Sequence, residues 1–178
     1  MVGTYYTQRL RLEPITAADA VGLWRLHADE PVAIWWLGRL RLPAAQAVAD
    51  EMAAGWARDG VHKWLAYDRV SGELIGRGGL SYQHVDGARR LEIGWIVRAR
   101  YWGRGYATEI GRAGLDVGFG ELGADEIVAF TEPDNRRSRA VMERLGMRDP
   151  RPITHRGEHF VLYTLPRPSP RPSTRHSR

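Results

Sequence analysis

The sequence of 178 residues contains no cysteine, which excludes disulfide bonds, a thiolate nucleophile and a cysteine-ligated zinc site. It has no apolar run near the roughly 18 residues that a membrane-spanning helix needs, and residues 1–14 lack the apolar segment of a signal peptide. Lysine is almost absent: Lys63 is the one lysine among 26 basic residues, which we interpret as a coding bias without function. The composition therefore predicts a soluble, cytoplasmic protein of one domain, whose stability comes from its core.

Positive charge is concentrated at the C-terminal end of the sequence. The net charge of the sequence is +5. Residues 166–178 contain four arginines and no acidic residue, so residues 1–165 have a net charge of only +1. Four prolines and three serines keep this segment from burying apolar surface. We therefore expect a folded domain at 1–165 and a disordered tail at 166–178. Such a tail could bind nucleic acid through nonspecific electrostatics, although an ordinary solvated terminus is the favoured interpretation.

Hydrophobic periodicity predicts a single domain with both helices and strands. Alternating Leu10 and Leu12 indicate a strand at 9–13 that ends at Pro14, whereas Pro43 and Gly60 stand where a helix typically begins and ends. The remaining predicted elements are, in chain order, a helix after Thr16, strands at 63–68, 74–82 and 90–97, a helix at 106–118, a strand at 126–131, a helix at 138–145 and a strand at 158–165. Early hairpins and later helical connections predict an α/β fold with a mixed sheet and helices on its faces.

A glycine-rich turn joins the strand at 90–97 to the following helix. Residues 102–108 read W-G-R-G-Y-A-T, and the alternating Gly103, Gly105 and Ala107 allow a ligand to approach the backbone closely. The N–H groups at a helix start have no intrahelical partner, and the helix dipole there favours negative charge. Together with the Arg104 cation these features indicate a phosphate-binding cradle. An ordinary strand-to-helix turn explains the same residues equally well.

Three segments follow one another along the chain: the strand LEIGWIV (91–97), the turn YWGRGYATE (101–109) and the segment EPDNRRSRAVMERLGM (132–147). Together they resemble the GNAT superfamily of acyl-CoA N-acyltransferases, and most closely its RimJ/RimL-type branch. The resemblance extends over about residues 9–165. It implies a GNAT fold, in which the central strands of the mixed sheet splay into a V. It also implies acetyl-CoA as co-substrate, with its pantetheine arm in the gap of the V.

The resemblance also assigns residues to the co-substrate site. The backbone of Arg104 to Thr108 would receive the pyrophosphate, and the end of the preceding strand would pair with the pantetheine amides. Asn135 would contact the CoA arm, and Ser138 would lie close to the sulfur. The complete expected set is Trp95, Ile96, Val97, Trp102, Gly103, Arg104, Gly105, Tyr106, Ala107, Thr108, Asn135 and Ser138.

Two residues are candidates for acid–base chemistry. Acyl transfer requires an amine that loses a proton and a thiolate that gains one. Glu92 shares a strand face with Gly94, which leaves open space beside it. GNAT proteins often have a carboxylate here that acts as the base. The alternative is a solvated or salt-bridged strand glutamate, for which Arg90 is a candidate partner. Many GNAT proteins have a tyrosine as thiolate donor where this sequence has Met142, so Ser138 or solvent would supply that proton. Ordinary helix N-terminal chemistry is the alternative for Ser138.

Weaker signals concern the acceptor side and metal binding. Trp35 and Trp36 lie in the loop that borders the acceptor site in GNAT proteins and would wall off the amine, with ordinary hydrophobic packing as the alternative. No histidine has metal-ligand spacing with another ligand, so no metal is predicted. Residues 118–123 match G-x-G-x-x-G, but they follow a helix and precede a strand, the reverse of a dinucleotide site, so we interpret them as a helix end.

These observations together predict an acetyl-CoA-dependent N-acetyltransferase that transfers acetyl directly to a primary amine. The RimJ/RimL resemblance favours a protein N-terminal α-amine as acceptor, and a homodimer would fit that branch. Small amines, such as polyamines or aminoglycoside-like compounds, are the alternative acceptors. A GNAT module that binds acyl-CoA without catalysis is a further alternative, supported by Met142. The hypothesis of a nucleic-acid-binding protein depends on the basic tail alone, and we rank it last.

Overall fold

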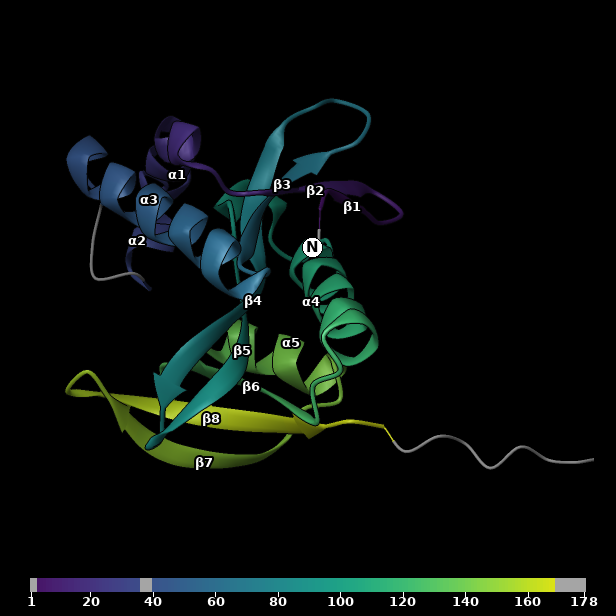
Figure 1. The fold of residues 1–178 in the computed structure, drawn as a ribbon. Coiled ribbons are helices and arrows are strands. Elements are labelled where there is room, and N and C mark those ends of the chain that lie inside the picture. The colour runs from purple at the N-terminus through teal and green to yellow at the C-terminus, as the bar shows by residue number, and fades with distance from the viewer. Residues whose placement is uncertain (1–2, 36–39, 169–178) are drawn as a thin grey trace, which may run out of the picture.

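The computed structural model describes residues 3–35 and 40–168 and shows a sheet with helices on both of its faces (Figure 1). Its eight strands follow the order β1-β2-β3-β4-β5-β6-β8-β7. β5 and β6 pair in parallel, and the other described ladders are antiparallel. The predicted α/β fold with a mixed sheet is therefore confirmed.

The strands are β1 (Tyr5–Tyr6), β2 (Leu10–Pro14), β3 (Lys63–Asp68), β4 (Leu74–Val85), β5 (Ala88–Val97), β6 (Glu126–Thr131), β7 (Arg148–His155) and β8 (Glu158–Pro166). The helices are η1 (Ala17–Asp19), α1 (Ala20–His27), α2 (Glu30–Ala33), α3 (Leu42–Asp59), η2 (Ala99–Tyr101), α4 (Tyr106–Asp116), the π-helical turn η3 (Val117–Glu121) and α5 (Arg136–Arg144). None of the helices in the described ranges is long and apolar enough to cross a membrane.

Several predicted element ends are confirmed and others are corrected. Gly60 ends α3 with a φ of +68°, and its N–H donates to the carbonyl of Trp56. The strand predicted at 9–13 is β2, which ends at Pro14 as predicted, with Pro14 as its last residue opposite Trp64. The helix predicted at 106–118 ends at Asp116 and continues as the π-helical turn, which contains most of the G-x-G-x-x-G match.

The periodicity did not predict β7, an edge strand of the sheet. Pro150 and Pro152 lie within it, and prolines within a pattern argue against a central strand. At a sheet edge a missing N–H donor is tolerated, because one side of the strand needs no partner. The β7–β8 register also shifts between Arg148 and Arg151, where Asp149 has a φ of +54°. Such a bulge hides the alternation that identifies a strand.

The C-terminal boundary lies beyond the predicted one. β8 extends to Pro166, and the Arg167 backbone N–H donates to the carbonyl of Asp125 at 2.7 Å. The Arg167 side chain also donates to the carbonyl of Ala124. The expectation of a disordered tail concerns mainly residues 169–178, which lie outside the described residues.

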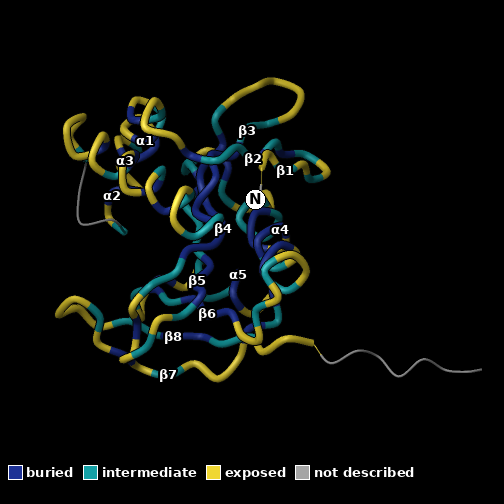
Figure 2. The backbone as a smooth tube through the Cα atoms, viewed as in Figure 1, coloured by how far each residue is buried: buried dark blue, intermediate teal, exposed yellow. Residues whose placement is uncertain are grey.

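Side chains of β3 alternate between two layers of the core. Leu65 points toward α1 and α3, where it packs with Leu23 and Met52. Its neighbour Trp64 belongs to the main core, which contains Ile110 of α4. Figure 1 accordingly shows α1 and α3 on one side of β3 and β4 and α4 on the other. Figure 2 shows the buried residues concentrated along β4, β5 and the inner side of α4.

The sheet opens between its two parallel strands. Within the described residues, β5 and β6 share the single register pair Glu92↔Val128. β5 continues to Val97 and remains paired with β4 on its other edge, while β6 pairs with β8. Residues 93–97 therefore have an edge without a strand partner, as the expected V requires.

Close approach of β4 to its neighbours depends on Gly78. A Cβ built there would lie 2.7 Å from the carbonyl oxygen of Gly94 on β5 and 2.6 Å from Cγ2 of Ile110 on α4. The β5 backbone is held by its ladder and cannot give way as a side chain can. By contrast, a Cβ on Gly22 of α1 would meet its nearest atom, Cδ1 of Leu65, at an ordinary 3.5 Å.

We predict that Gly78→Ala lowers the free energy of unfolding by about 1–3 kcal/mol, because the added methyl group overpacks the core. The matched variant Gly22→Ala should be neutral or stabilising by up to about 1 kcal/mol, because alanine is the better helix former. Urea unfolding followed by circular dichroism measures both. Equal effects of the two substitutions would contradict this account of the β4–β5–α4 contact.

Candidate active site

Two glycines shape the loop that leads into α4. The φ angle is +75° at Gly103 and +81° at Gly105, values that favour glycine. A Cβ on Gly103 would meet no atom within 4 Å, and one on Gly105 would meet only Nη2 of Arg9, at 3.6 Å. The backbone of this loop is therefore accessible to a ligand, as the sequence predicted.

The first turn of α4 supplies hydrogen-bond donors. Gly105 is the N-cap and has no side chain that could cap the helix. No group in the described part of the chain accepts from the backbone N–H groups of Tyr106, Ala107 or Thr108. Donors of this kind at the positive end of a helix dipole suit an anion such as a pyrophosphate. The loop therefore fits the diphosphate of CoA.

Arg9 fixes this loop from the N-terminal segment, a role that the sequence did not predict. Its guanidinium forms an ion pair with Glu109 of α4 at 2.6 Å and donates to the carbonyl of Arg104 at 2.9 Å. Burial raises the pKa of Glu109, but hydrogen bonds from Thr7 and Arg9 outweigh it and hold that pKa below its ordinary value. The carboxylate in the first helical turn is thus balanced by a cation beside the predicted phosphate cradle.

The parallel pairing of β5 and β6 places two functional segments at one end of the sheet. The glycine loop follows β5 and α5 follows β6, so both leave from the carboxyl ends of neighbouring strands. The guanidinium of Arg137 on α5 lies 4.7 Å from the ring centroid of Trp102, so α5 and the glycine loop are in contact. Trp102 also donates through Nε1 to the carbonyl of Val97 at 2.7 Å. It therefore anchors the loop to the end of β5.

The predicted CoA-arm residues lie in two places. Trp95 and Ile96 are half-buried and Val97 is buried on the part of β5 without a β6 partner, where their backbone could pair with amide groups. Asn135 caps α5, since its Oδ1 accepts from the backbone N–H of Ser138 at 3.1 Å. Contact of these residues with the CoA arm remains a prediction.

Ser138 lies one turn before Met142 on α5. Met142 is buried in the main core and has no proton to donate. The hydroxyl of Ser138 has no hydrogen-bond partner among the described residues. It is therefore available to a ligand, and its role as thiolate proton donor remains a prediction.

Glu92 lies in the middle of β5 with 7% of its surface exposed. Its Oε2 accepts from Nζ of Lys63 at 2.7 Å and from the hydroxyl of Ser81 at 3.2 Å. The alternative of a salt-bridged glutamate is therefore confirmed in part: Glu92 forms an ion pair, but with Lys63 and not with Arg90, which pairs with Glu126. Glu92 is thus neither solvated nor bound to its neighbour on the strand, but held in a buried pair from β3.

Lys63 is the residue of this site that sequence reasoning missed. It is 6% exposed and donates to the carbonyl of Gly79 as well as to Glu92, each at 2.7 Å. Burial lowers the pKa of Lys63, and the Glu92 carboxylate opposes that shift. The available signal was that Lys63 is the only lysine in the sequence. Its meaning required the β3–β4–β5 register, which no local pattern contains.

The predicted acceptor wall is described only in part. Trp35 follows α2 and is half-buried, and Trp36 lies outside the described residues. A separate cleft runs between residues 5–9 and α4 and includes Gly105 and Thr108, but not Glu92. It therefore adjoins the predicted phosphate cradle and does not reach Glu92. Across residues 3–35 and 40–168, no three His, Asp or Glu side chains gather as metal ligands would.

Comparison with known proteins agrees with this geometry. The model of the acetyltransferase (GNAT) domain family matches residues 9–148. An uncharacterised protein of Bacillus subtilis, YkkB, is 36% identical over 158 residues, which cover 88% of this chain and 92% of that protein. An acetyltransferase of Agrobacterium tumefaciens has a TM-score of 0.78 at 29% identity, covering 93% and 95% of the two chains. A GNAT-family acetyltransferase of Bacillus anthracis has a TM-score of 0.74 at 23% identity, covering 92% and 98%.

A splayed mixed sheet with a glycine loop at its opening defines a GNAT-type acyltransferase. The chain belongs to the GNAT acetyltransferase family, whose members use acetyl-CoA.

Two histidines are buried on the α1–α3 side of the sheet. His27 lies beside Arg77, and His62 packs against Gly55 of α3. Burial, reinforced by Arg77, lowers the pKa of His27 to about 3. Burial and then the nearby Lys63 lower the pKa of His62 to about 4. Both histidines are therefore neutral in the folded protein at neutral pH.

These low pKa values predict a loss of stability in mild acid. Below the unfolded pKa of about 6.5 the unfolded chain binds more protons than the folded one, so stability falls as the pH drops. Each histidine should contribute about 2 kcal/mol to this loss between pH 7 and pH 5. Urea unfolding of the wild type and His62→Gln at both pH values measures the contribution of His62. A destabilisation by His62→Gln that is the same at both pH values would contradict it.

Proposed function

We propose that the protein is an acetyl-CoA-dependent N-acetyltransferase in which Glu92 is the general base for a primary amine. The observation that carries this proposal is the position of Glu92. It is a buried carboxylate on the strand that leads into the glycine loop, at the register pair beyond which β5 and β6 diverge. A base is required there, because the amine must lose a proton as it attacks the thioester.

The residues of this chain divide the work between binding and proton transfer. When bound, acetyl-CoA supplies the acetyl thioester, and the N–H groups of Tyr106, Ala107 and Thr108 hold its pyrophosphate. The free edge of β5 from Trp95 to Val97 orients its pantetheine arm. Asn135 holds the start of α5 in place through its cap.

Glu92 then accepts the proton of the attacking amine. A new C–N bond forms as the C–S bond breaks, and the departing thiolate takes a proton from the hydroxyl of Ser138 or from solvent. The absence of cysteine fits direct transfer without a covalent enzyme intermediate.

The favoured acceptor is a protein N-terminal α-amine. The W-G-R-G-Y motif at 102–106 and its RimJ/RimL likeness support it, as does a ribosomal-protein alanine acetyltransferase of Vibrio fischeri with a similar fold (TM-score 0.73, 16% identity). An aminoglycoside acetyltransferase bound to coenzyme A has a TM-score of 0.74 at 20% identity, so small amines are the second candidate class. At these identities the likeness concerns the fold alone.

Gly105→Glu should weaken acetyl-CoA binding by roughly tenfold or more, because it directs a carboxylate toward the pyrophosphate. Gly87→Glu is the matched control, since Gly87 also has a positive φ, of +75°, and open space, but lies at the opposite end of β5. Isothermal titration calorimetry with acetyl-CoA compares both with the wild type, for which we expect micromolar binding. Absence of wild-type binding would overturn the proposed function, and equal losses in both variants would remove the loop from the site.

Glu92→Gln should lower kcat by roughly 10²-fold or more without weakening acetyl-CoA binding, because the amide cannot accept the amine proton. Thiol release measures the rate with four amines: a peptide beginning with alanine, one beginning with serine, spermidine and paromomycin. Full activity of Glu92→Gln would exclude it as the base. Binding of acetyl-CoA without turnover of any amine would favour the non-catalytic module.

A further inference from the structure

A buried ion pair supports the proposed base from the neighbouring strands. Lys63, Gly79 and Gly94 form one row across β3, β4 and β5. A Cβ on Gly94 would lie 2.6 Å from Oε1 of Glu92 and 3.5 Å from Nζ of Lys63. The missing side chain therefore provides the space in which the two charged groups meet.

The two oxygens of Glu92 have different surroundings. Oε2 receives both hydrogen bonds, one from Lys63 and one from Ser81, whose own hydroxyl accepts from Gln83 at 3.1 Å. No described residue donates to Oε1, which lies over Gly94. The carboxylate is thus tethered at one oxygen and open at the other.

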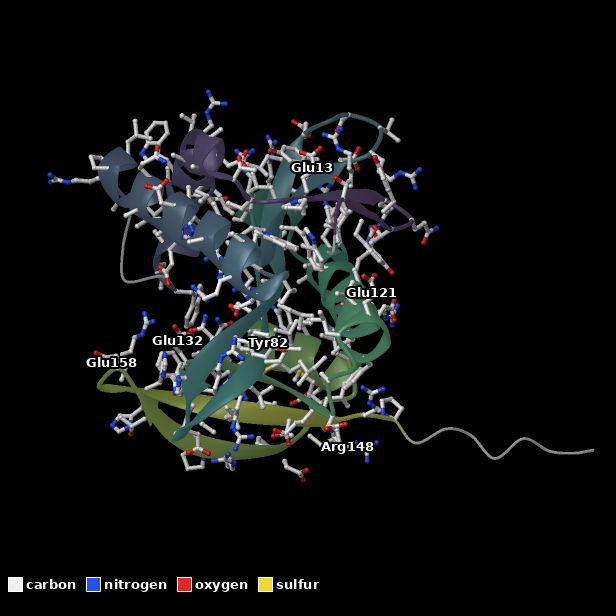
Figure 3. All side chains as sticks on the ribbon, in the orientation of Figure 1. Glu13, Tyr82, Glu121, Glu132, Arg148 and Glu158 are labelled. Atoms are coloured by element: carbon white, nitrogen blue, oxygen red, sulfur yellow. The ribbon has the colours of Figure 1, made fainter. Side chains whose placement is uncertain are left out.

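Stability alone does not explain this arrangement. Removing two charges from water costs several kcal/mol per ion, and apolar residues in their place are often as stable or more stable. Figure 3 labels Glu13 on β2 and Glu158 beside the β7–β8 turn, which belong to the two parts of the sheet on either side of the β5–β6 opening. The Lys63–Glu92 pair lies where these two parts meet, because Glu92 is the β5 residue that pairs with β6 before the two strands separate. A costly pair at this point indicates a role in the chemistry.

We propose that Lys63 is a positioning residue for Glu92: it holds Oε2, so that the carboxylate keeps one orientation and Oε1 faces the amine. This inference rests on the proposed role of Glu92 as the base. Arg77 and His155 are further charged or titratable groups within electrostatic reach of Glu92. Neither forms a hydrogen bond with Glu92 in the described structure, so the tether depends on Lys63 and Ser81.

A double-mutant cycle in kcat tests the proposal, with the fastest of the four amines as acceptor. Lys63→Met alone should lower kcat by roughly tenfold or more, because Oε2 loses its charged donor and the carboxylate is no longer held in place. In the Glu92→Gln background the same substitution should cause almost no further loss, because Lys63 acts through Glu92. Lys63→Arg, which keeps the cation, should recover part of the rate. Losses that multiply in the double variant would overturn the proposal.

The variants must first be shown to fold. Thermal unfolding and acetyl-CoA titration are measured for each, and the double variant, which removes both charges of the ion pair, should be at least as stable as Lys63→Met. If Lys63→Met does not fold, the comparison of Glu92→Gln with the double variant still decides whether Lys63 acts only through Glu92. Failure of the wild type to bind acetyl-CoA, or full activity of Glu92→Gln, would instead overturn the proposed function.

The single lysine permits a test that needs no acceptor. Protein labelled with [15N]lysine has one lysine side-chain signal, so its assignment is immediate. That signal should move on Glu92→Gln, which removes the partner of Lys63. It should stay in place on Glu126→Gln, which removes a carboxylate from the neighbouring strand, paired with Arg90. If the lysine signal does not move on Glu92→Gln, the ion pair does not form in solution, and the proposal is excluded.

Discussion

The divergence of β5 and β6 is the constraint on which the rest of the site depends. The two parallel strands share the register pair Glu92↔Val128 and then separate. Because they are parallel, their carboxyl ends place the glycine loop and the start of α5 at the same edge. The contact between Arg137 and Trp102 connects α5 to the glycine loop at this edge. Donors for an anion, an unpaired strand edge and a buried carboxylate thereby lie around one opening.

Space for this opening is made by residues without side chains. Gly78 lets α4 and β5 approach β4, and Gly94 leaves room for the Lys63–Glu92 pair. Gly103 and Gly105 keep the loop in front of α4 open to a ligand. Larger residues at the first two positions would meet backbone or charged groups within the core. The glycines thus determine where the densely packed sheet can accommodate a co-substrate.

Charge is balanced on both sides of the site. Arg9 pairs with Glu109 beside the phosphate cradle, so an acid in the first helical turn does not repel an anion. Lys63 pairs with Glu92 where the sheet opens, so the buried carboxylate has a cation as its partner. Both cations come from segments far away in the sequence: Arg9 directly precedes β2, and Lys63 begins β3.

Local patterns in the sequence determined much of the protein. Strand alternation, the Pro43 and Gly60 helix signals, the glycine loop and the Asn135 cap are all short-range features, and the structure contains them. The edge strand β7 was not predicted, because its prolines and bulge conceal the alternation of apolar and polar residues. The partner of Glu92 was decided only by the tertiary structure. Lys63 precedes it by 29 residues and meets it through the register of three strands, which depends on the packing of the whole sheet rather than on any local pattern.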